Sequence, residues 1–438
     1  MHEQEFHQLV NIEQGLVSPR IFIEPEIYEW ELERIFARCW LYLAHESQIP
    51  EPGDYVAAFM GEDPMIVCRD PQGHIRAFLN SCTHRGMRVC REEAGHTKAF
   101  RCPYHGWTFD TAGKLIGVPR LNDGYFRQLE KEKWGLIEVA QLATYKGLIF
   151  ASWDPEAPSL DDYLGDMKWY IDLMVDRLEG GSEVIGGVHK WVIPANWKFA
   201  ADNFVGDMYH VPVSHGSGLA LGLISERDIS RGFQVSVGNG HGRGGADQWD
   251  VESWSDPASP HLKFLYENRE EITHRLGQQR AQILLAGHGT IFPNFSFLDI
   301  PGFLTFRVWH PRGPERMEIW SWCVVEKKAP PEVKNMMRLA YLAQFGPGGV
   351  VEQDDGENWS QCTLAMRGRV RRRYMLNYQM GLGRQQVRPG IPGQTSPTIW
   401  SEIGQRGFYR RWLELMTAPR WSDVNTGGES NGRDESPV

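Results

Sequence analysis

Two short and similar motifs near residues 80–110 each contain one cysteine and one histidine. The first places Cys82 two residues before His84, and the second places Cys102 three residues before His105, with seventeen residues between His84 and Cys102. Two loops of this kind that meet would offer two thiolates and two imidazoles. A [2Fe–2S] cluster with two Cys on one iron and two His on the other needs this set of ligands. We therefore predict that these four residues bind such a cluster.

Three alternative interpretations of the two motifs are disfavoured. A structural zinc site also uses two Cys and two His, but its usual spacing pairs Cys with Cys and His with His. Buried Cys and His side chains that bind no metal would be ordinary in one motif, but two matching motifs disfavour this interpretation. A disulfide between Cys82 and Cys102 does not fit the seven scattered cysteines, an odd set that indicates a reducing compartment.

A second group of candidate ligands follows about a hundred residues downstream. Asn203, Asp207 and His210 are spaced i, i+4, i+7, which predicts that they share one face of a helix. Pro212 interrupts that helix and lets His215 turn back towards His210. Two imidazoles and one carboxylate, with open positions, are the ligand set of ferrous iron that activates O2.

The carboxylate of this set has two possible sources. Asp207 is local and could bind the metal itself, whereas the pair Asp354–Asp355 lies far downstream and is the better candidate. Taken alone, these residues would more often form a polar helix face with satisfied histidines. The cluster motif in the same chain reverses that judgement.

The elements that position these residues change in type along the chain. Residues 24–38 have apolar side chains at helical spacing, and from 53 to about 155 short apolar runs alternate with turn residues, which predicts a small all-β module. Beyond about 158 helices and strands mix, with a buried strand at Met317–Val324 and a helix that ends before Gly346.

These changes divide the chain into four predicted parts. Residues 1–38 are the N-terminal part of a catalytic domain, 39–157 form the cluster domain, and 158–421 complete the catalytic domain. Residues 422–438 are polar and Gly-rich, which predicts a disordered tail.

The overall composition excludes several classes of protein. The 438 residues suggest two domains or one large domain with an insertion. The formal net charge is −10, and an acidic chain is poorly suited to nucleic acid phosphates. No run of eighteen apolar residues occurs, and the N-terminus MHEQEFHQLV lacks the pattern of a signal peptide. We expect a cytoplasmic protein with no membrane span and no nucleic acid partner.

The two metal motifs, in this order, resemble those of the α subunits of bacterial aromatic-ring-hydroxylating dioxygenases, the family of naphthalene, biphenyl and polycyclic aromatic hydrocarbon dioxygenases. The resemblance runs from about Ile21 to Trp421 and includes Trp309–Pro314 and Phe345–Gly356. It implies an α+β fold, in which a small all-β Rieske [2Fe–2S] domain is inserted before a larger helix-grip-like catalytic domain with an antiparallel sheet.

The resemblance also implies roles for the residues of the second group. Three of them bind a mononuclear Fe(II): His210, His215 and Asp355. Asp207 then bonds to His210 on one side and to the cluster ligand His105 of a neighbouring subunit on the other. Asn203 lies near the iron.

Partners and reaction follow from the same resemblance. The chain would form a homotrimer, in most members extended to an α3β3 hexamer by a small β subunit. Two electrons would come from NADH through a reductase, a ferredoxin or both, because this chain has no Gly-rich dinucleotide fingerprint. Both atoms of O2 would add to an aromatic hydrocarbon and give a cis-dihydrodiol.

Alignment with the family's motifs predicts a substrate pocket that is mostly apolar, although each of its residues could also simply pack the core. The pocket residues are Phe204, Met208, Val211, His288, Phe345 and Val351. Val351 lies four residues before Asp355, where enzymes for two- and three-ring hydrocarbons usually carry a large aromatic residue. The smaller side chain predicts a larger, polycyclic substrate.

A run of arginines in this acidic chain allows a second candidate function. The run consists of Arg367, Arg369, Arg371, Arg372 and Arg373. A solvated surface is the first interpretation, and a docking site for an acidic ferredoxin is the second. If one arginine instead reached the pocket, the chain would hydroxylate an aromatic carboxylic acid.

Two further classes of protein are disfavoured by particular features. A pure electron carrier leaves about 280 residues beyond the β module without a role. A zinc-stapled binding protein would be colourless, whereas a Rieske cluster is red-brown.

Overall fold

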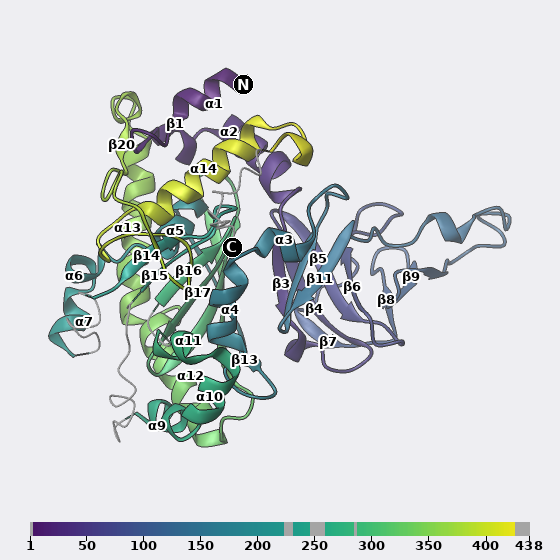
Figure 1. Ribbon diagram of the computed structural model, residues 1–438. Coiled ribbons are helices and arrows are strands. Elements are labelled where there is room, and N and C mark those ends of the chain that lie inside the picture. Colours follow the sequence, from purple (N-terminus) through teal and green to yellow (C-terminus); the bar gives the residue numbers. More distant parts are fainter. Residues whose placement is uncertain (1–2, 223–230, 246–258, 284–286, 425–438) are drawn as a thin grey trace, which may run out of the picture. The chain divides into compact units, whose positions relative to one another are not determined.

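The computed structural model describes residues 3–222, 231–245, 259–283 and 287–424 (Figure 1). The chain divides into two units: unit 1 contains Met1–Ile35 and Asp161–Val438, and unit 2 contains Phe36–Leu160. The chain passes from one unit to the other within a π-helical turn (Leu32–Phe36) and at the start of α3 (Leu160–Leu164). The N-terminal segment therefore belongs to the same unit as the long C-terminal part.

Unit 2 consists of short antiparallel strands, as its alternation of apolar runs and turns predicts. The strands form three sheets in the orders β11-β12-β3, β6-β5-β4-β7 and β10-β9-β8. Their bounds are β3 Leu41–His45, β4 Asp54–Met60, β5 Asp63–Arg69, β6 Ile75–Leu79, β7 Ala94–His96, β8 Ala99–Arg101, β9 Thr108–Asp110, β10 Leu115–Gly117, β11 Gln141–Tyr145 and β12 Leu148–Ser152. Cys82 and Cys102 belong to the apolar cluster of this unit, so both motifs are anchored in a core.

Unit 1 contains a nine-stranded antiparallel sheet among its described residues, in the order β13-β19-β18-β17-β16-β15-β14-β22-β21. The strands are β13 Ser182–Ile193, β14 Phe233–Ser236, β15 Gly242–Gly245, β16 Gly287–Ile291, β17 Phe295–Ile300, β18 Phe303–Pro311, β19 Met317–Glu326, β21 Gln386–Arg388 and β22 Ile391–Thr395. Every residue of β18 is buried, so both faces of this strand are covered. A small second sheet joins β1 (Val10–Asn11), β2 (Leu16–Val17) and β20 (Leu376–Asn377).

Helices of unit 1 pack along the sheet in succession: α14 contacts β14 and β15, α5 contacts β16 to β18, and α12 contacts β18 and β19. The helices are α1 Glu3–Leu9, α2 Pro25–Glu31, α4 Met167–Val175, α5 Trp197–Phe204, α6 Val211–Ser214, α7 Gly216–Ala220, α9 Pro260–Glu267, α10 Arg269–Leu276, α11 Gln278–Gln282, α12 Pro331–Phe345, α13 Val350–Met366 and α14 Ile403–Thr417. The predicted α+β class with an antiparallel sheet is confirmed, and so is the helix end before Gly346.

Several predicted boundaries differ from the structure, and the domain predicted at 39–157 corresponds to Phe36–Leu160. The regular helix predicted over 24–38 is α2, which covers only Pro25–Glu31 before the π-helical turn begins. The tail was expected to start at residue 422, but Trp421–Asp423 form a 3-10 turn and Val424 is buried. Residues 425–438 of the predicted tail lie outside the described residues.

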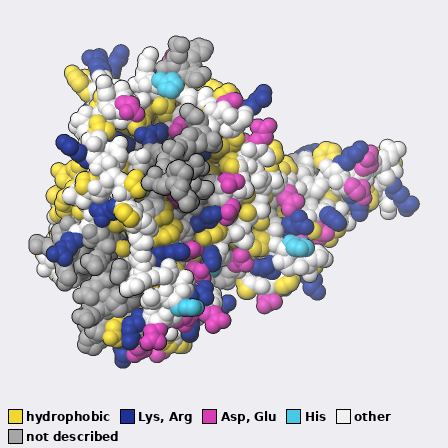
Figure 2. All heavy atoms as spheres, in the orientation of Figure 1, with side chains coloured by type: hydrophobic (Ala, Val, Ile, Leu, Met, Phe, Trp, Pro, Cys, Tyr) yellow, Lys and Arg dark blue, Asp and Glu magenta, His cyan; other side chains and the backbone are white. Residues whose placement is uncertain are grey.

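Charge and hydropathy of the described part add two findings. Figure 2 shows Lys and Arg side chains interspersed with Asp and Glu over the face in view. The chain's net charge of −10 therefore does not form an acidic patch on this face. Within the described ranges, no helix combines the length and the apolar character needed to cross a membrane.

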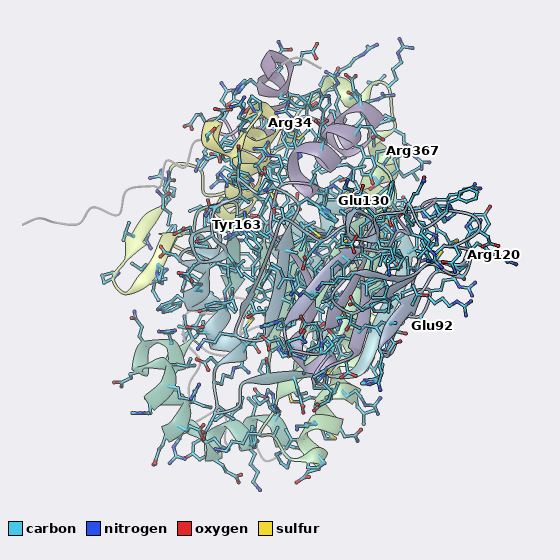
Figure 3. All side chains as sticks on the ribbon, turned by 90° about the vertical axis from the view of Figure 1, so that its right-hand side faces the viewer. Arg34, Glu92, Arg120, Glu130, Tyr163 and Arg367 are labelled. Atoms are coloured by element: carbon cyan, nitrogen blue, oxygen red, sulfur yellow. The ribbon has the colours of Figure 1, made fainter. Side chains whose placement is uncertain are left out.

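A buried charged cluster ties the N-terminal segment to the rest of unit 1. Glu31 of α2 accepts hydrogen bonds from Lys198 Nζ (2.7 Å), Trp197 Nε1 (3.0 Å) and Trp412 Nε1 (2.7 Å), and Lys198 and Glu31 are both fully buried. Nearby, Arg34, labelled in Figure 3, donates to the carbonyl of Ala418 (2.8 Å). The contacts join α2, α5 and α14, and α5 leads directly into the second group of candidate ligands.

Replacing Lys198 by Met should strongly destabilise unit 1, because it leaves the Glu31 carboxylate buried without a cation. Breaking a buried ion pair in this way costs about 3–5 kcal/mol, and we expect a loss of that size in the free energy of unfolding measured by urea denaturation. The matched control is Lys328→Met, which removes a partly exposed ion pair with Glu271 and should cost at most about 1 kcal/mol. Equal losses in the two variants would contradict the assigned role of the cluster.

Candidate metal centres

The loops that carry Cys82 and Cys102 have the same backbone hydrogen bonds. In each loop the cysteine N–H donates to the carbonyl five residues ahead, at 2.8 Å for Cys82 and 2.7 Å for Cys102. The glycine four residues ahead, Gly86 or Gly106, donates back to the cysteine carbonyl at 2.8 or 3.0 Å. Both glycines have a positive φ, 72° and 75°, which explains why this residue type stands there. The two turns therefore present their cysteine and histidine in a similar way.

The four side chains of the two loops lie close together. The ring centroids of His84 and His105 are 4.6 Å apart, and His84 also stacks on Trp107 at 4.9 Å. Burial and the neighbouring Cys102 thiol raise the pKa of Cys82, so both favour the neutral thiol. A metal cation bound at Cys82 would stabilise the thiolate instead. The Nδ1 atom of His84 is buried and, among the described residues, has no hydrogen-bond partner. A lone pair left unused in this way fits a metal ligand.

A single zinc ion does not fit these four donors. Within the part of the chain that the structure describes, none of them belongs to a group of three or more His, Cys, Asp or Glu donor atoms that all lie within 4.8 Å of one another. Tetrahedral zinc, with bonds of about 2.0–2.3 Å, would bring all four donors within about 4 Å of one another. A cluster in which Cys and His bind different irons tolerates the wider spacing.

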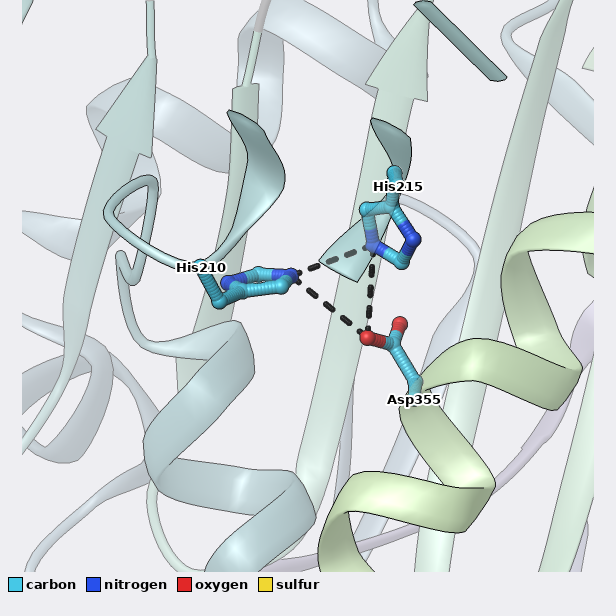
Figure 4. A group of neighbouring side chains, drawn as sticks. All are labelled: His210, His215 and Asp355. Atoms are coloured by element: carbon cyan, nitrogen blue, oxygen red, sulfur yellow. Dashed lines mark hydrogen bonds and ion pairs between the residues drawn. The ribbon is translucent and has the colours of Figure 1, made fainter. Parts of the chain in front are cut away.

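The second site brings together His210, His215 and Asp355 from segments far apart in the sequence (Figure 4). His210 immediately precedes α6, His215 lies between α6 and α7, and Asp355 lies in the second turn of α13. The two Nε2 atoms are 3.2 Å apart, and Asp355 Oδ1 is 3.4 and 3.3 Å from those of His210 and His215. A point equidistant from the three atoms lies about 1.9 Å from each, close to the bonds of about 2.0–2.2 Å that such ligands make to first-row metal ions.

The prediction that Asn203, Asp207 and His210 share one helix face is wrong. Helix α5 ends at Phe204, and the chain turns at Gly206, which has a φ of 148°. A Cβ atom at Gly206 would lie 3.1 Å from a backbone nitrogen of β15, so a side chain would press against the sheet. The three residues nevertheless meet, because the turn folds back beside the end of the helix.

Carboxylates behind the two imidazoles hold the rings in orientation. His210 Nδ1 lies 3.2 Å from Asp207 Oδ2, and His215 Nδ1 lies 3.2 Å from Asp354 Oδ2. The Asn203 amide donates to the same Asp207 oxygen at 3.3 Å. With both Nδ1 atoms used in this way, both Nε2 atoms point at Asp355, which is the carboxylate–histidine–metal arrangement of metal sites. The sequence alone did not indicate this role of Asp354.

The electrostatics of the site favour positive charge between the three donors. Burial lowers the pKa of His210, but hydrogen bonds to Asp207 and Asp355 outweigh it and raise that pKa to about 10. Burial raises the pKa of Asp355, yet the two histidines lower it overall. Asp355 Oδ1 is buried and lies 3.4 and 3.3 Å from the Nε2 atoms of His210 and His215. A divalent cation would satisfy all three donors at once.

The predicted pocket residues come from several segments of unit 1. Phe204 packs against His288, with ring centroids 5.9 Å apart, and burial lowers the pKa of His288 to about 4, so this imidazole is neutral. Phe345 and Val351 are buried at the end of α12 and the start of α13, where Val351 is one helical turn from Asp355. The remaining two, Met208 and Val211, flank His210 along the chain.

A buried ion pair beside these residues was not predicted from the sequence. Arg307 of β18 pairs through Nη1 with Glu352 of α13, and its Nη2 donates to the carbonyl of Phe345 (2.8 Å). The signal was present, since Arg307 interrupts an apolar strand and a cation there requires a partner. Its guanidinium is engaged by Glu352 and therefore has no free charge for a substrate carboxylate.

The arginine run lies at the surface and away from Asp355. Arg367 follows the last residue of α13, twelve residues after Asp355, which corresponds to about 18 Å along a helix. Figure 3 labels Arg367, whose side chain is 54 % exposed and pairs with Glu315. Arg371–Arg373 form a 3-10 turn with no buried residue.

Comparisons with known proteins agree with this geometry. Residues 160–418 match the family model of the ring hydroxylating alpha subunit (catalytic domain), and residues 39–145 match that of the Rieske [2Fe-2S] domain. The chain is 45% identical to the biphenyl 2,3-dioxygenase subunit alpha of Rhodococcus jostii, over 97% of this chain and 94% of that one. It is 44% identical to a benzene 1,2-dioxygenase subunit alpha of Pseudomonas putida, over 95% and 94% of the two chains. The crystal structure of naphthalene 1,2-dioxygenase from Rhodococcus sp. bound to indole superposes with a TM-score of 0.87 at 43% identity, covering 95% of this chain and 98% of that one.

Single substitutions of ligands should remove one metal centre and leave the other in place. We expect Cys102→Ser to lose the red-brown colour and the cluster irons while it keeps the mononuclear iron, because only the cluster uses this thiolate. Asp355→Ala should do the opposite. Visible spectra and iron content per chain measure both effects.

The matched control is Cys90→Ser, in the same core but outside the two loops. The Cys90 thiol donates to the carbonyl of Glu92 (3.5 Å), so its loss should leave colour and iron unchanged. A colourless Cys90→Ser protein, or a red-brown Cys102→Ser protein, would show that the ligands are assigned wrongly.

Proposed function

Since this chain belongs to the family of ring-hydroxylating dioxygenase α subunits, we propose that it is the terminal oxygenase that adds both atoms of O2 to an aromatic hydrocarbon and forms a cis-dihydrodiol. Membership makes it a Rieske non-haem iron oxygenase, with a [2Fe–2S] domain and an iron-binding catalytic domain. The observation that carries the proposal is the convergence of His210, His215 and Asp355 within 4.8 Å.

Iron bound by these three residues would activate O2 with electrons from the cluster. The chain's own residues supply the geometry. His210, His215 and Asp355 would hold the iron with three protein ligands and so would leave open positions for O2. Asp207 and Asp354 keep the imidazoles aimed at the metal. Phe204, Phe345 and Val351 contribute apolar surface that binds a hydrocarbon and keeps water out.

The proposed substrate is a hydrocarbon and not an aromatic carboxylic acid. The relatives are named for biphenyl, benzene and naphthalene, none of which is an acid. A substrate carboxylate would need a buried cation with free charge. Arg307 contacts the pocket residues Phe204 and Phe345, and it is already paired with Glu352. The small side chain at Val351 favours substrates with several rings.

We propose that the enzyme acts as an assembly with separate electron donors. The relatives are named as alpha subunits, which supports partner subunits. Three α subunits would form a ring in which Asp207 accepts a hydrogen bond from His105 of the next subunit, with small β subunits completing an α3β3 hexamer. The side chain of Asp207 is 28 % exposed, so its carboxylate can be reached from outside the chain. A reductase, with or without a ferredoxin, would deliver electrons from NADH in the cytoplasm.

Product analysis tests the proposed reaction. The reduced protein, with its β subunit if one exists, is given O2 and a panel of two- to four-ring hydrocarbons beside aromatic carboxylates. We expect mass spectrometry to detect cis-dihydrodiols from the hydrocarbons. Products from the carboxylates alone would overturn the hydrocarbon assignment.

Asp207→Ala should keep both metal centres, with excess Fe(II) supplied, and lose nearly all turnover. Removing the carboxylate breaks the hydrogen-bonded path from His210 towards the neighbouring cluster. We expect the turnover rate to fall by at least about 100-fold, which is the upper end of the loss seen when residues that hydrogen-bond to metal ligands are replaced. In a single turnover with substrate and O2, the cluster should stay reduced, which visible absorption records.

The control for this variant is Asp354→Ala, which removes the equivalent carboxylate from His215. This change should weaken iron binding or activity by about 10-fold, yet allow the cluster to reoxidise. Normal reoxidation in Asp207→Ala would exclude the bridging role.

Val351→Phe should narrow the range of substrates. The larger side chain occupies space beside Asp355, so rates with three- and four-ring hydrocarbons should fall by at least about 10-fold, relative to one- and two-ring compounds. Val350→Phe is the matched control, because Val350 is its chain neighbour at the same helix start but is 41 % exposed. If Val350→Phe narrowed the substrate range equally, or Val351→Phe did not narrow it, the assignment of Val351 to the pocket would be wrong.

A further inference from the structure

A single buried cation holds the corner between α12 and α13. Helix α12 ends at Phe345 and α13 begins at Val350. Arg307, reaching from β18, donates to the carbonyl of Phe345 (2.8 Å) and pairs with Glu352, and so binds the chain on both sides of the corner. Both charged side chains are almost fully buried, at 0 % and 2 % exposure.

The same guanidinium packs on the rings of the predicted pocket. Its central carbon lies 5.0 Å from the ring centroid of Phe345 and 5.5 Å from that of Phe204. Both distances are within the range of cation–π attraction, which strengthens when water is excluded. Arg307 therefore touches aromatic residues from two different segments, α5 and α12.

A displacement of this corner would also move Asp355, the carboxylate of the candidate iron site. Glu352 lies three residues before Asp355 on α13, and Val351 is its chain neighbour. Residues three or four apart on a helix lie on one face, so Val351 and Asp355 move with Glu352 as a rigid body. The corner itself is tightly packed, since a Cβ atom at Gly349 would lie 2.4 Å from the carbonyl oxygen of Gln344.

Stability does not explain why a charged pair occupies this place. Arg307 Nε and Glu352 Oε1 are both buried without a hydrogen-bond partner among the described residues, so the pair is incompletely satisfied. Apolar residues of similar volume are often as stabilising as a buried ion pair, or more so. The pair provides instead a directional contact that fixes one position of the corner.

We propose that Arg307 is a positioning residue that determines the regioselectivity of ring attack. It holds Phe204, Phe345 and the start of α13 in one arrangement, and thereby sets where a polycyclic hydrocarbon lies relative to the metal bound at Asp355. Substrates with several non-equivalent double bonds are the class whose products depend on this position. The inference rests on the proposed dioxygenase function.

The test compares Arg307→Met, Arg307→Lys and the double variant Arg307→Met/Glu352→Met with the wild type. The double variant leaves no unpaired buried charge and should fold even if Arg307→Met does not. The ratio of dihydrodiol regioisomers from phenanthrene should change by roughly 10-fold in the double variant, because a misplacement of about 1 Å can change rates by 10²-fold. Arg307→Lys keeps the charge and should restore part of the wild-type ratio.

A second measurement does not depend on turnover. Chelator competition gives the affinity for Fe(II), which should weaken about 10-fold in Arg307→Met or the double variant because Asp355 is less well placed. Arg312→Met is the matched control, since Arg312 pairs with Glu318 near the end of β18 and not with the corner. It should leave both the ratio and the affinity unchanged.

The outcomes separate the inference from the function it rests on. A folded, iron-loaded double variant with wild-type regioisomer ratio and wild-type iron affinity would overturn the role of Arg307. If the wild type forms no dihydrodiol at all, the proposed function fails, and the iron affinities still decide whether Arg307 positions Asp355.

Discussion

Three metal-binding atoms that face one another, two from buried side chains and one from a partly buried side chain, form the constraint on which the catalytic unit depends. The Nε2 atoms of His210 and His215 and the Oδ1 atom of Asp355 lie 3.2–3.4 Å apart. Buried polar atoms need partners, and one cation bound between these three atoms would satisfy all of them at once. The arrangement persists because Asp207 and Asp354 hold each ring from behind. Metal binding thus completes a site that the protein has already oriented.

The fold brings this arrangement together from segments separated by about 140 residues. A turn after α5 supplies one imidazole, the α6–α7 turn supplies the other, and α13 supplies the carboxylate. The sheet anchors all three, because α5 packs on β16 to β18 while Arg307 of β18 binds the start of α13. Buried ion pairs at Glu31 and Glu352 fix the helices whose positions decide the geometry.

Local features of the site could be predicted from the sequence, and non-local ones could not. The spacing of Cys82, His84, Cys102 and His105 was sufficient to predict the cluster domain, since each pair of ligands lies within one short loop. Spacing alone gave Asn203, Asp207 and His210 a helical face that does not exist, because the turn at Gly206 depends on its contact with β15. The choice of Asp355 within the pair Asp354–Asp355 required the family resemblance. The pairing of Arg307 with Glu352 joins residues 45 apart, and no local pattern indicates it.

In the proposed reaction, one metal site delivers both atoms of a single O2 molecule to the substrate. Turnover under a mixture of 16O2 and 18O2 tests it directly, with the dihydrodiol analysed by mass spectrometry. We predict diols that carry either two heavy or two light oxygens, in the proportions of the two gases. A large fraction of product with one heavy and one light oxygen would contradict the claim, since the two atoms would then have come from different molecules.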